Sequence, residues 1–241
     1  MLAVAENASP TKSAMRRDKV APWQHTAFIL LILAGWAVYG ALRSTSGAVP
    51  ETPRWLRYSA QIMALSLMTG TTIAGLYQRR RFIRALVGRI DWVRDAWAGL
   101  LIFLAGTALI VIVGLLLRPL QFLHLTHMRD VVLAISPHTR PELALWMLVS
   151  ASAGVCEEFI FRGYLLRQVL HWSGSSVIAV AGSAILFGSM HLYEGTAAAI
   201  QITVLGAWFG AVAVRRGSLR QVAIAHFLQD AIAGLALFLH H

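Results

Sequence analysis

Charge is scarce in this 241-residue chain, and acidic charge is the scarcest. Only 13% of the residues are charged, with 11 Asp and Glu against 21 Lys and Arg, while 57% are hydrophobic and the mean hydropathy is +0.63. Soluble domains usually carry about 25% charged residues. The composition therefore excludes an ordinary soluble domain and indicates an integral membrane protein.

Cysteine is nearly absent as well. The single residue, Cys156, excludes an internal disulfide and any metal site built from several cysteines. The shortage of acids leaves a net charge of +10. A basic balance is compatible with nucleic-acid binding, but Lys and Arg also crowd the cytoplasmic loops of membrane proteins. We therefore predict the lipid bilayer as a partner and no nucleic acid.

Long apolar runs take the place of the missing charge. About 20 helical residues cross the hydrocarbon core of a bilayer, and the sequence contains seven runs of roughly this kind. We predict an all-α fold, a polytopic transmembrane helical bundle of about seven spans. The approximate bounds are 25–42, 58–77, 95–117, 143–170, 175–192, 196–214 and 219–239.

The connections between these runs indicate an organisation and an orientation. Residues 1–22 form a polar tail, residues 23–142 hold the first three spans with their loops, and residues 143–241 hold the other four. Most Lys and Arg lie in the tail, after the second span and after the sixth, which predicts a cytoplasmic N-terminus. The alternative is that the first run is a cleaved signal peptide, because small residues follow at 46–48.

The fourth span contains three ionisable residues, Glu157, Glu158 and Arg162. Such a residue costs roughly 2.5–3.5 kcal/mol on membrane-insertion scales, so it normally faces the bundle interior or a wet cavity and serves a function. Residues four apart share a helix face, which predicts an ion pair between Glu158 and Arg162. Glu157 has no basic residue at that spacing and is expected to face a cavity.

Two later spans repeat the four-residue spacing, with Phe187 and His191 in one and His226 and Asp230 in the other. A carboxylate in an apolar site can act as general base on a water, while histidines orient the water or stabilise an oxyanion. Alternatively, Glu157, His191 and His226 would bind a zinc ion with an open fourth position. Either arrangement hydrolyses an acyl bond such as a peptide. The remaining interpretation is that these groups only bond helices together.

The ordered set of motifs resembles the three motifs of the CPBP family, the intramembrane CAAX prenyl endopeptidases and their relatives linked to bacteriocin processing and self-immunity. The likeness covers residues 143–235, and its motifs are Glu157-Glu158-x-x-x-Arg162, Phe187-x-x-x-His191 and His226-x-x-x-Asp230. It implies a catalytic helical core in residues 143–241. It also implies a multi-pass protein of the bacterial inner membrane whose substrate is a peptide or a prenylated protein.

The resemblance assigns a role to each motif residue. Glu157 would activate the hydrolytic water together with His191, and Arg162 would hold Glu158. His226 and Asp230 would bind the water or the oxyanion. The prenyl proteases proper commonly have Asn at the last position, and an ionised Asp cannot donate to an oxyanion. The Asp at position 230 therefore argues against a CAAX substrate more than it argues against a hydrolase.

The cofactor and two other functions stay open. The family has been described both as metalloproteases and as metal-free glutamate-dependent proteases, so the expected cofactor is a divalent metal such as zinc, or none. A non-catalytic immunity or partner-binding protein would use the same polar cavity for binding. A proton-coupled transporter would use acids and histidines of the same region as a proton relay. The residues of this relay would be Glu157, His191, His226 and Asp230.

Overall fold

A computed structural model of the chain describes residues 19–45, 52–121 and 133–240. Residues 1–18 of the predicted cytoplasmic tail lie outside the described part of the chain. The same is true of residues 46–48, on which the signal-peptide alternative depends.

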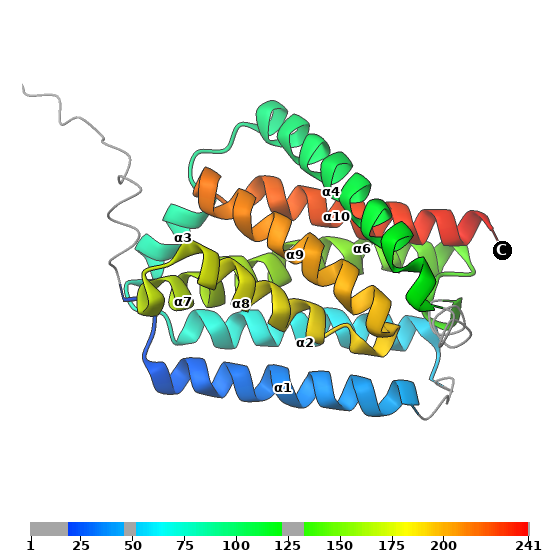
Figure 1. The fold of residues 1–241 in the computed structure, drawn as a ribbon, viewed down its shortest axis with the longest axis horizontal. Helices are drawn as coiled ribbons and strands as arrows, with labels where there is room; N and C mark the ends of the chain where they lie inside the picture. Colours follow the sequence, from blue (N-terminus) through cyan, green and yellow to red (C-terminus); the bar gives the residue numbers. More distant parts are fainter. Residues whose placement is uncertain (1–18, 46–51, 122–132, 241) are drawn as a thin grey trace, which may run out of the picture.

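All seven predicted spans are helices, and the described residues contain no strand. The fold is therefore a polytopic helical bundle, as predicted (Figure 1). The fourth span is one continuous rod in which a π-helix, η2, separates two α-helices. The bounds are α1 Trp23–Thr45, α2 Arg54–Ala74, α4 Trp92–Gln121, α6 Arg140–Glu158 with η2 Phe159–Leu165 and α7 Leu166–Ser173, α8 Ser176–Ser189, α9 Thr196–Arg216 and α10 Arg220–Leu239.

Five of these seven are long and apolar enough to cross a membrane by length and composition: α1, α4, the α6–η2–α7 rod, α9 and α10. Helix α2 is not among them, and α8 is too short, with 14 residues. The sequence-based bounds of the fifth span were wrong at its end, because α8 stops at Ser189 and His191 lies in the turn that follows.

The basic helix α3, Arg79–Val87, was not predicted from the sequence. Figure 1 shows α3 at the end of the bundle where α1 begins, where α9 ends and where α10 begins. These segments carry Arg79, Arg80, Arg81 and Arg84 in α3, Arg215 and Arg216 in α9, and Arg220 in α10. The basic segments that were predicted to share one side of the membrane therefore lie at one end of the molecule.

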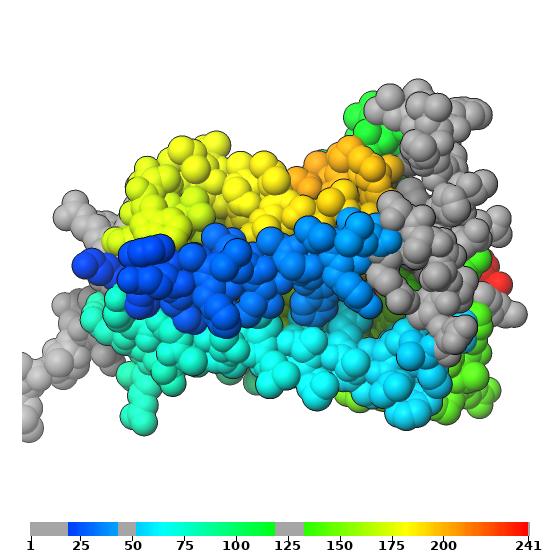
Figure 2. Space-filling model, turned by 90° about the horizontal axis from the view of Figure 1, so that it is seen from below, coloured from blue at the N-terminus to red at the C-terminus, as the bar shows by residue number. Residues whose placement is uncertain are grey.

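The α6–η2–α7 rod is central to the packing. Helices α2 and α10 pack against α6, α8 packs against α7 and η2, and α4 covers α9 and α10. Helix α1 lies across the outside of this arrangement, between α2 and α8 (Figure 2). The largest group of buried apolar side chains surrounds η2, which brings the charged residues at its start into the bundle interior.

A glycine permits the close approach of the two helices that carry most of the ionisable groups. A Cβ atom on Gly154 of α6 would lie 2.8 Å from the carbonyl oxygen of Ala223 and 3.1 Å from the backbone nitrogen of Phe227, both in α10. Backbone atoms cannot yield as a flexible side chain can. Gly154 therefore allows α10 to place His226 beside the two glutamates one turn further along α6.

Candidate active site

The two glutamates lie at the junction of α6 and η2, near the middle of a 34-residue membrane-spanning rod. Single π-turns within α-helices are rare, and those that occur are often found at functional sites. In η2 the carbonyl of Phe161 accepts a hydrogen bond of 2.9 Å from the Ser183 hydroxyl of α8. This bond joins the irregular turn to the neighbouring helix.

The predicted ion pair between Glu158 and Arg162 is present. Arg162 Nη1 lies 2.9 Å from Glu158 Oε1, and the two side chains are 1% and 0% exposed. Arg162 Nη2 also donates to the Gly206 carbonyl at 3.2 Å, and the guanidinium carbon lies 4.2 Å from the centre of the Phe187 ring. Desolvation of a buried pair is costly unless further hydrogen bonds satisfy it. Here α9 and an aromatic face provide those contacts.

His226 lies among three carboxylates. Its Nδ1 is 2.9 Å from Glu158 Oε1, and because a carboxylate accepts, Nδ1 donates this hydrogen bond. Its Nε2 is 3.7 Å from Glu157 Oε2 and 3.5 Å from Asp230 Oδ2. Both distances exceed the usual range of about 2.7–3.2 Å for an N–H···O hydrogen bond. The Trp146 indole fixes this part of α10 by donating to the Asp230 carbonyl at 2.9 Å.

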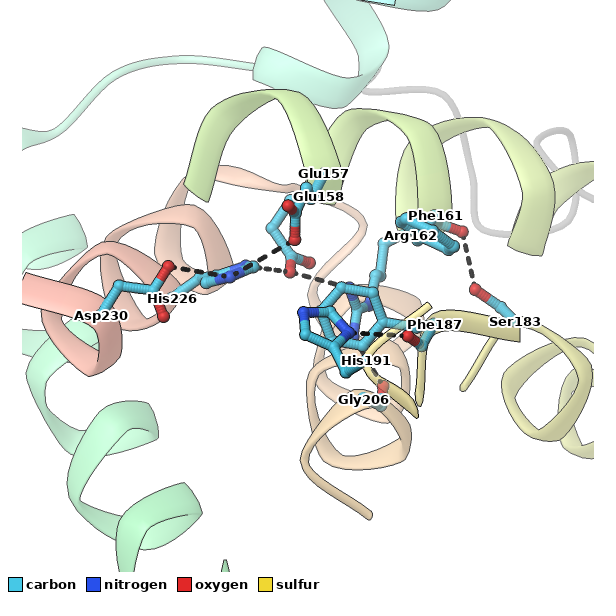
Figure 3. Close-up of polar contacts among 10 residues, drawn as sticks. All are labelled: Glu157, Glu158, Phe161, Arg162, Ser183, Phe187, His191, Gly206, His226 and Asp230. Carbon is cyan, nitrogen blue, oxygen red and sulfur yellow. Dashed lines mark hydrogen bonds and ion pairs between the residues drawn. The ribbon is translucent and has the colours of Figure 1, made fainter. Parts of the chain in front are cut away.

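Two buried carboxylate oxygens are unsatisfied. Glu157 Oε2 and Glu158 Oε2 have no hydrogen-bond partner among the described residues. Buried polar atoms are almost always paired with protein or water, so each exception needs an explanation. Figure 3 shows both glutamates directed toward His226, with His191 nearby. An acceptor of this kind is suited to bind a water or another donor.

A cavity of about 70 Å³ lies beside these groups, and Glu157, His191 and Tyr193 are part of its wall. His191 Nδ1 is 3.0 Å from the Phe187 carbonyl, so this nitrogen donates and Nε2 is the ring atom left for other contacts. The His191 ring stacks on Tyr193, with centroids 6.0 Å apart. Burial, together with the nearby Glu194, raises the pKa of the Tyr193 phenol well above its usual 10, so this side chain is a neutral donor.

All six site residues predicted from the sequence therefore lie in one region of the bundle. Glu157, Glu158, Arg162, His226 and Asp230 form a chain of contacts, and His191 shares the cavity with Glu157. Ser183, Tyr193 and Gly206, which also contact this region, were not predicted from the sequence. For Gly206 the sequence contained a signal, because Gly206-x-x-x-Gly210 is the small-residue spacing of close helix packing in membranes. Nothing comparable marks the other two.

The zinc alternative does not fit these residues. In the described ranges no group of three or more His, Cys, Asp or Glu side chains is arranged to hold a metal ion. Nδ1 of His226 donates to Glu158, so only Nε2 of this ring is left for other contacts.

Comparison with known proteins supports the same region. Residues 139–232 match the family model "Type II CAAX prenyl endopeptidase Rce1-like". This segment begins one residue before α6 and ends within α10, so it contains all six site residues. Comparison with curated proteins and with solved structures gave no match.

The resemblance to the CPBP and CAAX protease family is thus confirmed over residues 139–232. This segment carries a domain of the CAAX-type intramembrane peptidases, and the apolar helices make the chain an integral membrane protein. Helices α1, α2 and α4 lie outside the matched segment.

Proposed function

We propose that the chain is an intramembrane endopeptidase that cleaves a peptide bond with a water activated by Glu157 and histidine. The observation that carries this proposal is the buried Glu157 Oε2, which accepts no hydrogen bond from the described residues and belongs to a side chain that lines a cavity together with His191. A carboxylate held in apolar surroundings beside a cavity is a good position for a general base.

In the proposed reaction, a water in the cavity donates to Glu157 and attacks the carbonyl carbon of the scissile bond. Glu157 takes the proton as the new C–O bond forms, and the carbonyl oxygen becomes an oxyanion. The C–N bond then breaks, and the leaving nitrogen takes the proton from Glu157. His191 Nε2 orients the water, because the bond from Nδ1 to Phe187 fixes the ring.

The second glutamate has a positioning role in this proposal. Glu158 receives bonds from Arg162 and His226 on the same oxygen, Oε1, and so holds the imidazole at a set orientation. His226 Nε2 then faces Glu157 and Asp230. From this position a protonated Nε2 of His226 donates to the water or to the oxyanion. Asp230, whose Oδ2 lies near the same nitrogen, helps to orient the imidazole.

We further propose that the end of the bundle with α3 and the start of α1 faces the cytoplasm. The gathering of Arg residues there supports this orientation, since basic residues flank membrane spans on the cytoplasmic side. A bacterial inner membrane and a peptide or prenylated protein substrate are the expectations that fit the family of the matched segment.

Glu157→Gln tests the proposal because the amide keeps the size of the side chain and cannot take a proton. We expect kcat for cleavage of membrane-anchored peptides to fall about 10²- to 10⁴-fold, the usual contribution of a general base. Thermal unfolding of the purified variant in detergent should stay close to that of the unchanged protein.

Three results would count against this assignment. Full cleavage by Glu157→Gln would show that Glu157 is not the general base. A protein that cleaves no peptide but keeps its biological phenotype in the Glu157→Gln form would be a binding or immunity factor. Proton flux into sealed vesicles that needs Glu157 and His226 would favour the transporter alternative.

A further inference from the structure

A basic surface at one end of the bundle has no part in the proposed reaction. It consists of α3 and the start of α4, residues 79–97, and we call it the basic corner (Figure 1). The opposite face of α3 is apolar and packs on the bundle, with Leu86 only 1% exposed, so α3 has the two-faced pattern of a helix at a membrane surface. The arginines of the basic corner are all exposed: Arg79, Arg80, Arg81, Arg84, Arg89 and Arg94.

The acids of the basic corner do not neutralise this charge. Its two aspartates are used within the fold: Asp91 accepts a hydrogen bond of 3.1 Å from the backbone nitrogen of Arg94, and the buried Asp95 pairs with Arg220 of α10. Helix α3 contains no acid. Arg80 and Arg84 have no acidic partner among the described residues, and they lie four residues apart, where like charges repel. A bound anion would relieve this repulsion.

An open apolar groove lies at the start of α4, in the same helical turns as Arg94. Its volume is about 430 Å³, and its walls are Trp92, Val93, Ala96, Trp97 and Leu100. Trp92 and Trp97 are 77% and 63% exposed. Tryptophan is enriched where the hydrocarbon core of a bilayer meets the headgroups. The groove is therefore suited to an acyl chain whose headgroup lies beside the arginines.

The basic corner is fastened to α10. The backbone nitrogen of Leu219 donates to the Leu86 carbonyl of α3 at 3.1 Å, and Arg220 pairs with Asp95 of α4. Between α3 and α4, Gly88 has a φ of +61°, and a Cβ atom there would lie 3.1 Å from Arg220 Nη1. The surface is thus held in a defined position by the helix that also carries two residues of the candidate site.

We propose that the basic corner binds anionic phospholipids of the leaflet that it faces. Guanidinium groups bind phosphate oxygens through paired hydrogen bonds, and the groove receives one acyl chain of the same lipid. Phosphatidylcholine also has a phosphate, but its choline cancels the charge. The basic corner therefore favours phosphatidylglycerol over phosphatidylcholine. This proposal does not depend on the proposed peptidase function.

The test uses the full-length protein in liposomes and its own tryptophans. Phosphatidylglycerol and phosphatidylcholine are mixed, and only one of them carries brominated acyl chains, which quench tryptophan fluorescence on contact. We expect stronger quenching when phosphatidylglycerol carries the bromine. Varying its mole fraction gives the association constant relative to phosphatidylcholine. Trp92→Phe with Trp97→Phe removes the reporters in the groove and should remove most of the excess quenching.

Arg80→Gln with Arg84→Gln tests the charge. This variant should lower the relative association constant about tenfold or more, because each basic residue near an anionic membrane surface contributes roughly fivefold. Arg80→Lys with Arg84→Lys keeps the charge and should keep most of the preference. If the double Gln variant does not fold, Arg84→Gln alone should give a loss of about fivefold.

Arg118→Gln with Arg140→Gln is the matched control. Both arginines are exposed, Arg118 in the last turn of α4 and Arg140 at the start of α6, at the end of the bundle away from α3 (Figure 1). The variant loses the same charge and should keep the preference for phosphatidylglycerol.

Three results would overturn the proposal. The first is equal quenching by the two brominated lipids in the unchanged protein. The second is an equal loss of preference in the α3 variant and in the matched control, which would assign the preference to net charge. The third is loss of the excess quenching with millimolar inorganic phosphate, but not with chloride of the same ionic strength, which would identify a site for a free anion instead of a lipid.

Discussion

Helix α10 contacts two pairs of a buried carboxylate and an arginine. One is formed by Asp95 of α4 with Arg220, and the other by Glu158 with Arg162, which reaches α10 through His226. Arg220 and His226 are six residues apart, about 9 Å along the helix axis. The two pairs are thus close neighbours with the same chemical groups.

They differ in how completely the carboxylate is bonded. Asp95 Oδ2 accepts from Arg220 Nε at 2.6 Å and from the Asp91 backbone, and Oδ1 accepts from Arg220 Nη2 and from the Gln221 amide. At the candidate site, one oxygen of Glu158 accepts both hydrogen bonds, and Oε2 of each glutamate accepts no hydrogen bond from the described residues. A saturated carboxylate joins helices, whereas an unsaturated one beside a cavity is available for chemistry.

The largest expected effect comes from Arg162→Leu. It leaves Glu158 buried without its cation, and breaking a buried pair in this way costs about 3–5 kcal/mol. We expect a large loss of thermal stability and no cleavage, measured by unfolding in detergent and by peptide hydrolysis. Unchanged stability would show that the pair contributes little to holding η2 in place.

Asp95→Asn sharpens the contrast between the pairs. The amide keeps one acceptor, and Arg220, whose side chain is 20% exposed, can still reach water. Loss of the charged hydrogen bonds should lower the free energy of unfolding by about 1.5–3 kcal/mol. The kcat of the folded protein should stay within about twofold of the unchanged value. A collapse of kcat without loss of stability would mean that this pair, too, acts on the reaction.

Asp230→Asn should have a smaller effect, when the change in kcat is expressed as a free energy, than Asp95→Asn has on the free energy of unfolding. Asn restores the residue that is common in the prenyl proteases, keeps an oxygen to accept from His226 Nε2, and adds an N–H donor for the oxyanion. We expect kcat to stay within about tenfold of the unchanged value, which corresponds to about 1.4 kcal/mol in the activation free energy. A loss as deep as that of Glu157→Gln would instead assign the Asp230 carboxylate a direct part in proton transfer.

Chelation should have the smallest effect. Because the described acids and histidines do not form a metal-holding group, cleavage should persist after dialysis against a strong chelator. Peptide hydrolysis and metal content are measured on the same sample. Loss of activity that added zinc restores would return Glu157, His191 and His226 to the role of metal ligands.

Local rules were enough for part of this site. The ion pair of Glu158 and Arg162 and the neighbouring positions of His226 and Asp230 follow from four-residue spacing, and the structure has both. The same rule failed at the end of α8. It placed His191 within a helix, whereas His191 lies in the turn that follows α8 and lines the cavity from there.

The sequence by itself determined that the chain is a helical membrane protein and which ionisable residues are out of place in it. Apolar length and helical periodicity are properties of one segment at a time, so they can be read without a partner. Only the tertiary structure decided that Asp95 is saturated and Glu157 is not, that Tyr193 stacks on His191, and that α1 and α2 wall the cavity. Those facts depend on contacts between helices far apart in the chain, and no local pattern encodes them.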